Sequence, residues 1–355
     1  MGSRIRYKGT ILGILLAWLP LSGFTEPVTS SPWREAIFSV TDIDKTADLF
    51  GTLGDYVIHD EGALSESELV SWGLSPLAKG RYRVIGPSGA TTGLLRLIDF
   101  DDAGVQEPMR PGARAWDTGC YFSLMVRVKG IESLYRQAIE MGWWTETPIA
   151  PLQFGDSDLR IVIFKGPDGI QIQSYERLSP ALPEAVGPFD RMTRPFNIMQ
   201  MVEDHGRAYQ FFTEVLGFES FYTGPPVKAP QPVISPIGIP WSMTTEVGYQ
   251  AGIVYPTPGE YGRMEMIQVH GLDGQDYRDR CRAPNLGILA VRFPAPDLEL
   301  IAKRLDVAAV SYKQDPDVDL GHLGQVALLT TQSPDGAIIQ FYSTNENEGR
   351  AISNP

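Results

Sequence analysis

The sequence predicts an α+β fold in which a unit of one strand, one helix and three strands occurs four times, giving two domains of paired units. Two similar segments, 164–175 and 331–342, are the clearest evidence. In each, an apolar strand leads into Pro-Asp-Gly, and a second strand then alternates apolar and polar residues. Pro sets the first φ of such a turn and Gly takes the positive φ, so each segment predicts a β-hairpin. Its recurrence far along the chain indicates duplication, and 355 residues are enough for two domains with separate cores.

The first two units are predicted from apolar strands that flank amphipathic helices. Apolar residues recur at helical spacing from residue 131 onward, and Gly142 is well placed to end that helix. The elements of the first unit are strands at 36–40, 82–85 and 94–98 and a helix at 45–53; those of the second are a strand at 121–128, a helix at 131–142 and the first hairpin.

The last two units repeat this order. The third has strands at 196–202, 251–254 and 263–269 and a helix at 206–217; the fourth has a strand at 286–293, a helix at 297–305 and the second hairpin. A Pro-rich stretch at 224–240 interrupts the third unit and predicts a long loop over the sheet. The predicted divisions of the chain are a signal segment at 1–25, a first two-unit domain at 33–178, a linker at 179–194, a second two-unit domain at 195–345 and a tail at 346–355.

The N-terminus predicts a secretory signal peptide. Arg4, Arg6 and Lys8 precede an apolar run at 11–21, and small residues follow at 22–25. The run is shorter than the roughly 20 residues that a membrane-spanning helix needs. We therefore expect cleavage after about residues 22–26 and a periplasmic or secreted protein without a membrane span. The alternative is an uncleaved N-terminal anchor, since no Ala-x-Ala site is present.

The charge of the chain excludes some partners. Loss of the three basic residues of the signal changes the formal charge from −13 to −16. Such an acidic protein is poorly suited to nucleic acids or anionic membrane surfaces, so we expect a small-molecule partner and no nucleic acid.

Cys120 and Cys281 lie at corresponding places, each just before the first strand of a unit. In an oxidising compartment they can form a disulfide between the two halves. Two free buried thiols fit the sequence equally well.

Residues 209–218, Tyr-Gln-Phe-Phe-Thr-Glu-Val-Leu-Gly-Phe, resemble the "FY…VLGF" signature of the vicinal oxygen chelate superfamily, which includes glyoxalase I, bleomycin-resistance proteins and extradiol dioxygenases. The two Pro-Asp-Gly hairpins resemble its "DPDGN…E" ending. The resemblance covers about 33–178 and 193–345. It implies βαβββ modules whose sheets curl in pairs around a cup-shaped site, and hence two glyoxalase-like domains with curled mixed sheets.

In metal-using members of this family, ligands come from the first and last strands of the modules and are typically His and Glu. The matched positions here are Glu35, Ser123, Asn197 and Ile288 on first strands, and Arg96, Gln173, Glu265 and Gln340 on last strands. Divalent transition metals prefer imidazole, thiolate or carboxylate donors, and none of the four His is at a first-strand position. We therefore expect no cofactor, with a divalent metal disfavoured.

The second domain holds the residues best suited to chemistry. Glu265 is the candidate general base, because burial in a cup raises a carboxyl pKa toward working pH. Strand alternation predicts that Met264 and Met266 face the opposite side. Asn197 and Gln340 are expected in the same cup, where they would orient the substrate.

Three further residues complete the candidate site. His270, just past the strand of Glu265, is a second acid/base candidate. His322 lies in a Gly-flanked loop that can close over a site, and Trp241, after the Pro-rich loop, is a candidate aromatic wall. The alternatives are a bystander role for each His, and for Glu265 a solvated carboxylate or an ion pair with Arg263 or Arg292.

The sequence therefore predicts an exported protein that acts on a small, mostly apolar organic molecule by metal-independent proton transfer, as a lyase or isomerase. The alternative is a non-catalytic protein that binds or sequesters a small molecule. A metal-dependent dioxygenase or glyoxalase is the least favoured interpretation, because the chain has only four His.

Overall fold

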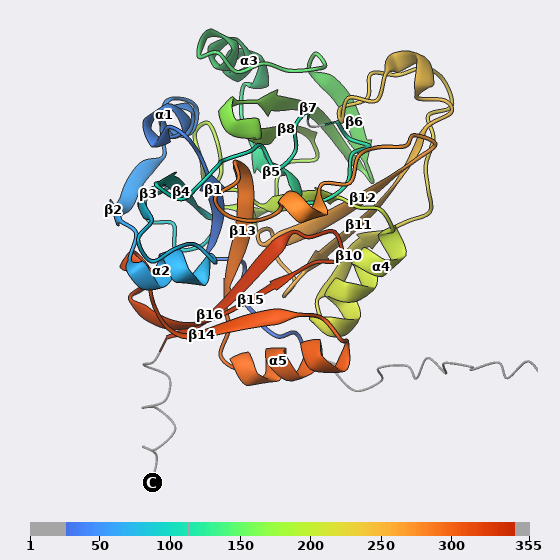
Figure 1. Cartoon of the computed structure of the whole chain (residues 1–355). Helices are drawn as coiled ribbons and strands as arrows, with labels where there is room; N and C mark the ends of the chain where they lie inside the picture. Colours follow the sequence, from blue (N-terminus) through green and yellow to red (C-terminus); the bar gives the residue numbers. More distant parts are fainter. Residues whose placement is uncertain (1–25, 113, 345–355) are drawn as a thin grey trace, which may run out of the picture.

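A computed structural model describes residues 26–112 and 114–344, which form sixteen strands and five α-helices (Figure 1). The predicted signal segment and the tail at 346–355 lie outside the described residues. Within them, no helix is long and apolar enough to cross a membrane.

The described chain contains four βαβββ modules, as the repeats predicted. Module one comprises β1 (Glu35–Ser39), α1 (Ile43–Gly54), β2 (Val57–Ala63), α2 (Glu66–Ser71), β3 (Lys79–Gly86) and β4 (Leu94–Asp101). Module two comprises β5 (Tyr121–Arg127), α3 (Ile131–Glu140), β6 (Ala150–Phe154), β7 (Ser157–Lys165) and β8 (Gln171–Ser179). Module three comprises β9 (Asn197–Met201), α4 (His205–Gln210), the π-helical turn η3 (Phe211–Val215), β10 (Glu219–Thr223), β11 (Gly248–Tyr255) and β12 (Arg263–His270). Module four comprises β13 (Gly287–Pro294), α5 (Leu298–Val307), β14 (Tyr312–Asp319), β15 (Gln325–Gln332) and β16 (Ile338–Thr344).

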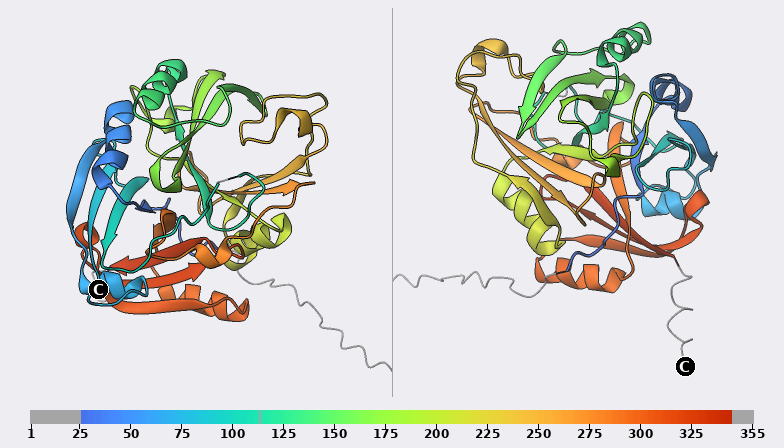
Figure 2. Two further views of the ribbon diagram at one scale, coloured as in Figure 1. Left: turned by 45° about the horizontal axis from the view of Figure 1, so that its top comes forward. Right: turned by 180° about the vertical axis from the view of Figure 1, so that it is seen from behind.

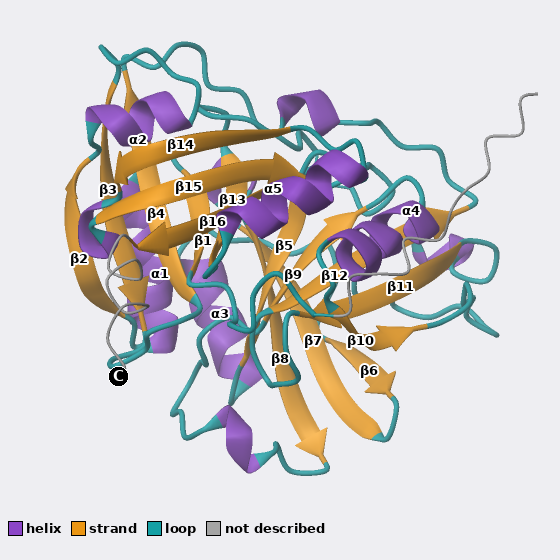
Figure 3. Ribbon diagram, turned by 90° about the horizontal axis from the view of Figure 1, so that it is seen from below, coloured by secondary structure: helices purple, strands orange, loops and turns teal. Residues whose placement is uncertain are grey.

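The modules pair in an order that differs from the sequence-based division. The first sheet runs β14-β15-β16-β13-β1-β4-β3-β2 and the second runs β10-β11-β12-β9-β5-β8-β7-β6 (Figure 3). Module one therefore shares a sheet with module four, and module two with module three. The expectation that 33–178 and 195–345 each form one two-module domain is wrong in this respect. All four first strands offer the same backbone hydrogen-bonding groups, so the partner of each is decided by tertiary contacts.

The register at the two seams is set by matching residue pairs. In the first sheet β1 runs antiparallel to β13, with Glu35 opposite Arg292. In the second sheet β5 runs antiparallel to β9, with Met125 opposite Asn197. The two sheets are thus built on the same plan.

Local sequence explains the helix that each module places on its sheet. Asp42, Asp204 and Asp297 cap the N-termini of α1, α4 and α5 by accepting a backbone N–H from the first turn. Gly142 adopts a positive φ beyond the end of α3, as predicted.

One apolar core joins α1, α3, α4 and α5 to the outer faces of both sheets. It includes Phe50 of α1, Leu134 of α3, Leu305 of α5, Phe38 of β1 and Leu124 of β5. The helices and sheets bury one another's apolar faces, and a single module would leave its own apolar face exposed to water.

The duplicated hairpins also connect the two sheets. Gly169 and Gly336 have φ of 74° and 81°, as the turns require. The Asp168 carboxylate of module two accepts the backbone N–H of Thr41 in module one (2.9 Å). The Asp335 carboxylate of module four likewise accepts the N–H of Glu203 in module three (2.8 Å). Each Asp thus binds the residue that precedes the N-cap of a helix, and that helix belongs to a module of the other sheet.

The alternative left open for the cysteines is resolved by the structure. Cys120 precedes β5 and Cys281 precedes β13, and the two form a disulfide with a Cα–Cα distance of 5.2 Å. The bond joins module two to module four, and so holds the first sheet to the second.

Candidate functional site

The inner face of the first sheet is filled by an ionic cluster. The side chains of Glu35, Arg96 and Arg292 are fully buried. Arg292 forms an ion pair with Glu35 and donates from Nε to Gln340 Oε1 (2.9 Å). Arg96 Nη2 donates to Glu68 Oε2 of α2 (2.7 Å). The short helix α2 thus covers this cup, and the carboxylate of its Glu68 balances the charge of Arg96. Apolar side chains fill the remaining space.

His322 belongs to this cluster. It lies in the 3₁₀ turn η6 (Gly321–Leu323), with its Nε2 3.3 Å from Glu35 Oε2. Burial disfavours ionisation of Glu35 and by itself would raise its pKa. The charge of Arg292, the hydrogen bond from His322 and the charges of Arg96 and His322 outweigh burial and lower the pKa to about 2. Glu35 is therefore a carboxylate held by cations.

Gln340 also lies in the first sheet, because β16 pairs with β13 and β15. The prediction that Gln340 shares a cup with Glu265 is therefore wrong, and His322 is equally remote from the Glu265 cup. The cause is the exchanged pairing of modules described above.

The inner face of the second sheet encloses a cavity of about 450 Å³. The edge strands β6 and β10 curl toward one another until the rings of Phe154 and Tyr222 meet edge to face, 5.3 Å apart. The Pro-rich loop lies over the cavity, as predicted, and contributes Pro225, Pro236 and Ile237 to its lining (gold in Figures 1 and 2). A ligand-sized, mostly apolar space is thus built from modules two and three.

Glu265 lies at the inner face of this cup. Glu265 lines the cavity from β12, whereas Met264 and Met266 pack into the main core on the opposite face, as strand alternation predicted. Asn197 Nδ2 donates to Glu265 Oε2 (2.7 Å). No hydrogen bond to the second oxygen, Oε1, occurs among the described residues, so that atom is free to meet a ligand.

The surroundings of Glu265 bring its pKa into the physiological range. Burial raises the pKa, and the hydrogen bond from Asn197 and the charge of Arg263 only partly offset this, leaving it at about 7. A carboxyl group with this pKa exchanges a proton readily near neutral pH.

Polar groups on the neighbouring strands are already paired with one another. Gln173 of β8 donates from Nε2 to Ser123 Oγ (2.5 Å), and its Oε1 accepts from the Tyr175 hydroxyl (2.9 Å). Burial raises the pKa of Tyr175, and the nearby Glu265 adds to the shift. These contacts fix the floor of the cup.

The structure corrects two of the matched first-strand positions. Met125, two residues beyond Ser123, lies opposite Asn197, and Arg292, four residues beyond Ile288, lies opposite Glu35. Ile288 instead packs in the main core. The shifts arise because the strands begin and bulge at places that the apolar pattern does not mark.

Two other predicted site residues lie away from the cavity lining. His270 is the last residue of β12 and lies near His205. Trp241, at the 3₁₀ turn η4 (Trp241–Met243), has 61% of its surface exposed. The expectation that Trp241 forms a wall of the cup is therefore wrong. Tyr249 of β11 lines the cavity instead.

The donor atoms in the second cup fit a divalent metal poorly. The positions that the resemblance associates with metal, with Met125 in place of Ser123 as the strand pairing requires, are Met125, Gln173, Asn197 and Glu265. Asn197 Nδ2 lies 3.2 Å from Met125 Sδ. They supply one carboxylate, two neutral amides and a thioether, which is a weak set for Zn²⁺ or Fe²⁺. Among the described residues no group of three His, Cys, Asp or Glu is placed to hold a metal ion.

Three arginines line one end of the cavity: Arg127 of β5, Arg177 of β8 and Arg263 of β12. Sequence reasoning named Arg263 only as a candidate ion-pair partner of Glu265, and it missed Arg127 and Arg177. Each of the three lies two or four residues from a matched position, namely Ser123, Gln173 and Glu265. Residues that are two or four positions apart on a strand share a face, and this alternation is the signal that places the arginines in the cup.

Comparison with solved structures identifies the fold. Glyoxalase I from Zea mays matches with a TM-score of 0.58 over 90% of this chain and 94% of its own, at 12% sequence identity. A candidate dioxygenase from Bacillus subtilis matches with a TM-score of 0.51 over 91% of this chain and 87% of its own, at 10% identity. The chain has the vicinal oxygen chelate fold.

This vicinal oxygen chelate fold is the one that the Val-Leu-Gly-Phe and Pro-Asp-Gly motifs predicted. No protein-family model matches the sequence, and a comparison with curated proteins gave no match. At such low sequence identities the structural likeness concerns the fold alone, so the chemistry must be argued from the residues of the cup.

Proposed function

We propose that this chain binds a small, mostly apolar organic molecule in the cup of the second sheet and transfers a proton on it with Glu265, without a metal. The observation that carries the proposal is a buried carboxyl group with a pKa of about 7, facing a cavity of about 450 Å³. Such a group is a competent general base at neutral pH.

The residues suggest how the transfer would occur. Ionised Glu265 accepts a proton from a carbon acid in the cavity, and the resulting carbanionic charge is delocalised into the substrate. Asn197 donates to Oε2 throughout and leaves Oε1 to face the substrate. The protonated Glu265 then returns the proton to another carbon, giving an isomer. In the lyase case the carbanion forms a double bond as the leaving group departs with its bonding electron pair, and Glu265 passes its proton to the leaving group or to water.

A neutral carbon acid tests whether Glu265 acts as a base. With 5-nitrobenzisoxazole, removal of the C3 proton breaks the ring N–O bond and releases a coloured cyanophenolate. We expect turnover that rises with pH through about 7, the pKa of Glu265, and loss of that activity in Glu265→Gln. The matched control is Glu140→Gln, an exposed residue of α3. Equal turnover by Glu265→Gln and the parent protein would contradict the proposal.

A second candidate function is binding or sequestration without turnover. Glu265 is the only carboxyl group in the described lining of the cavity, so a separate acid partner has to come from the substrate or from water. Binding of the same neutral compound by the parent protein without ring opening would favour this alternative.

We also propose that the protein is exported. The predicted signal sequence motivates this, and the Cys120–Cys281 disulfide supports it because disulfides persist in oxidising compartments. N-terminal sequencing of protein from the periplasm or medium should find a chain that begins after about residue 22–26. Recovery of an intact chain from the cytoplasm would contradict export.

A further inference from the structure

The three arginines of the second cup lie at the same end of it. In the strand pairing, Asn197 of β9 lies between Arg263 of β12 and Met125 of β5. Arg127 lies two residues beyond Met125, on the same face of β5. Arg177 is close enough to lower the pKa of both Arg127 and Arg263, although burial is the main cause of each shift. The three guanidinium groups therefore form one positive cluster at the rim.

One carboxylate faces this cluster. Glu260 Oε2 lies 2.7 Å from Arg127 Nη2 and 3.5 Å from Arg263 Nη2. Within the described lining of the cavity the one carboxyl group is Glu265, whose pKa of about 7 leaves it partly protonated at neutral pH. Two negative groups at most therefore oppose three positive ones.

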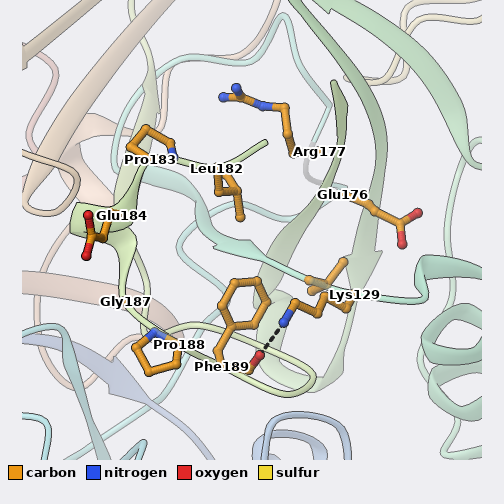
Figure 4. A pocket seen from close by; sticks show the side chains of 10 residues that line it. Lys129, Glu176, Arg177, Leu182, Pro183, Glu184, Gly187, Pro188 and Phe189 are labelled. Atoms are coloured by element: carbon orange, nitrogen blue, oxygen red, sulfur yellow. Dashed lines mark hydrogen bonds between the residues drawn. The ribbon is translucent and has the colours of Figure 1, made fainter. Parts of the chain in front are cut away.

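Arg177 carries the unbalanced charge. Its Nε is buried without a hydrogen-bond partner, and no ion pair of its guanidinium occurs among the described residues. Its neighbour Glu176 is directed away from it and is occupied by Arg160 (Figure 4). Arg177 also borders a second hollow, of about 460 Å³, between β8 and the linker. Arg177 thus lies between the cavity of the cup and the hollow beside the linker.

We propose that the ligand of this cup is an organic carboxylate, with its anionic group at the arginine cluster and its apolar body against the strand side chains. This inference rests on the proposed function and specifies its substrate class. Planar guanidinium groups bind carboxylates through two parallel hydrogen bonds, which makes arginine the residue suited to this role. The apolar body meets Leu159, Ile161 and Ile253.

This placement also limits which proton Glu265 reaches. Arg263 and Glu265 are alternate residues on the same face of β12, so their side chains leave the strand about 6–7 Å apart. A carboxylate bound at the rim therefore places a carbon two or three bonds from it beside Glu265. The substrate class is an apolar carboxylic acid with an acidic C–H near its carboxylate.

A matched pair of probes tests the inference. Binding of 2-naphthoate and of the neutral 2-naphthamide is measured by titration calorimetry at pH 6.5, where Glu265 is mostly protonated. We expect naphthoate to bind at least about tenfold more tightly than the amide, as one additional charge-assisted contact provides. Arg177→Gln should remove about tenfold from the naphthoate affinity and leave the amide within about twofold. Arg177→Lys should retain part of the preference.

The control and the outcomes separate this inference from the proposed function. Arg136→Gln, an exposed residue of α3, makes the same change in net charge and should alter neither affinity. Equal binding of the two probes, or an equal effect of Arg177→Gln on both, would overturn the carboxylate inference and leave the cup as a binding site. Failure of both probes to bind would overturn the small-molecule site itself.

Discussion

Glu35 and Arg292 are 257 residues apart in the sequence, yet they lie opposite each other at the seam of the first sheet and form a fully buried ion pair. The equivalent seam of the second sheet brings Met125 opposite Asn197. The same two positions of the seam therefore hold an ion pair in the first sheet and an uncharged pair in the second. Charged residues and α2 fill the first cup, whereas the uncharged seam pair Met125 and Asn197 leaves the second cup open to a ligand.

The seam ion pair should be essential to the stability of the first sheet. Glu35→Gln leaves Arg292 buried without its main counter-charge, so we expect unfolding in urea to show a loss of about 3–5 kcal/mol. Glu132→Gln, which breaks an exposed ion pair with Arg160, is the matched control and should cost less than about 1 kcal/mol. A similar small loss for both variants would contradict this account.

The same carboxylate predicts a direction for acid sensitivity. The pKa of Glu35 is lowered from 4.5 to about 2, so the unfolded chain binds its proton more readily than the folded one. Its contribution to stability is present above about pH 4.5 and is lost as the pH falls toward about 2. Glu35→Gln should therefore weaken the acid dependence of stability in that range.

Glu265 should make stability depend on pH in the opposite sense. Its pKa is about 7 in the folded state and 4.5 in the reference state, so the folded chain holds a proton that the unfolded chain has released. The contribution of Glu265 to the free energy of unfolding therefore falls as the pH rises from 4.5 to about 7. Relative to the parent protein, Glu265→Gln should unfold with similar free energy near pH 5 and gain on the order of 2 kcal/mol near pH 8.5. A difference that does not change with pH would exclude the raised pKa.

The disulfide should stabilise the arrangement of the two sheets. It closes a loop with a sequence separation of 161 residues, and the double change Cys120→Ala with Cys281→Ala should lower the unfolding free energy by about 2–5 kcal/mol. Single Cys120→Ala should lose a similar amount and leave Cys281 as one free thiol, which is buried and should react with a thiol reagent only after unfolding. Unchanged stability of the parent protein after full reduction would contradict the prediction.

The donor set of the second cup predicts little metal in the parent protein. Elemental analysis of protein purified without chelators should find less than one Fe, Mn or Zn per chain, since Met125, Asn197 and Gln173 are weak ligands. One tightly held ion per chain would contradict this prediction.

The positions themselves are close enough to be converted into a metal site. Asn197 Nδ2 lies 2.7 Å from Glu265 Oε2 and 3.2 Å from Met125 Sδ, which is close to the spacing of about 3.3 Å between donors of a tetrahedral zinc site. Met125→His with Asn197→His, beside Glu265, should therefore bind Zn²⁺ stoichiometrically by titration calorimetry. The same variant with Glu265→Gln is the control and should bind more weakly.

The sequence by itself determined the local architecture. The Pro-Asp-Gly turns, the helix spacing and the alternation around Glu265 predicted the four modules, the loop at 224–240 and the face on which Glu265 lies. These features depend on backbone dihedral preferences and on apolar periods of two and 3.6 residues, both of which are set by residues close together in the sequence. The same alternation places Arg127 on the face of Ser123 and Arg177 on the face of Gln173.

Only the tertiary structure decided which modules share a sheet, and with it which residues share a cup. That choice separated Gln340 and His322 from Glu265, joined Glu35 to Arg292, and gathered Arg127, Arg177 and Arg263 at one rim. The physical reason is that strands pair through backbone groups common to all residues. The partner is therefore selected by packing and charge matching between side chains far apart in the sequence, such as Glu35 and Arg292.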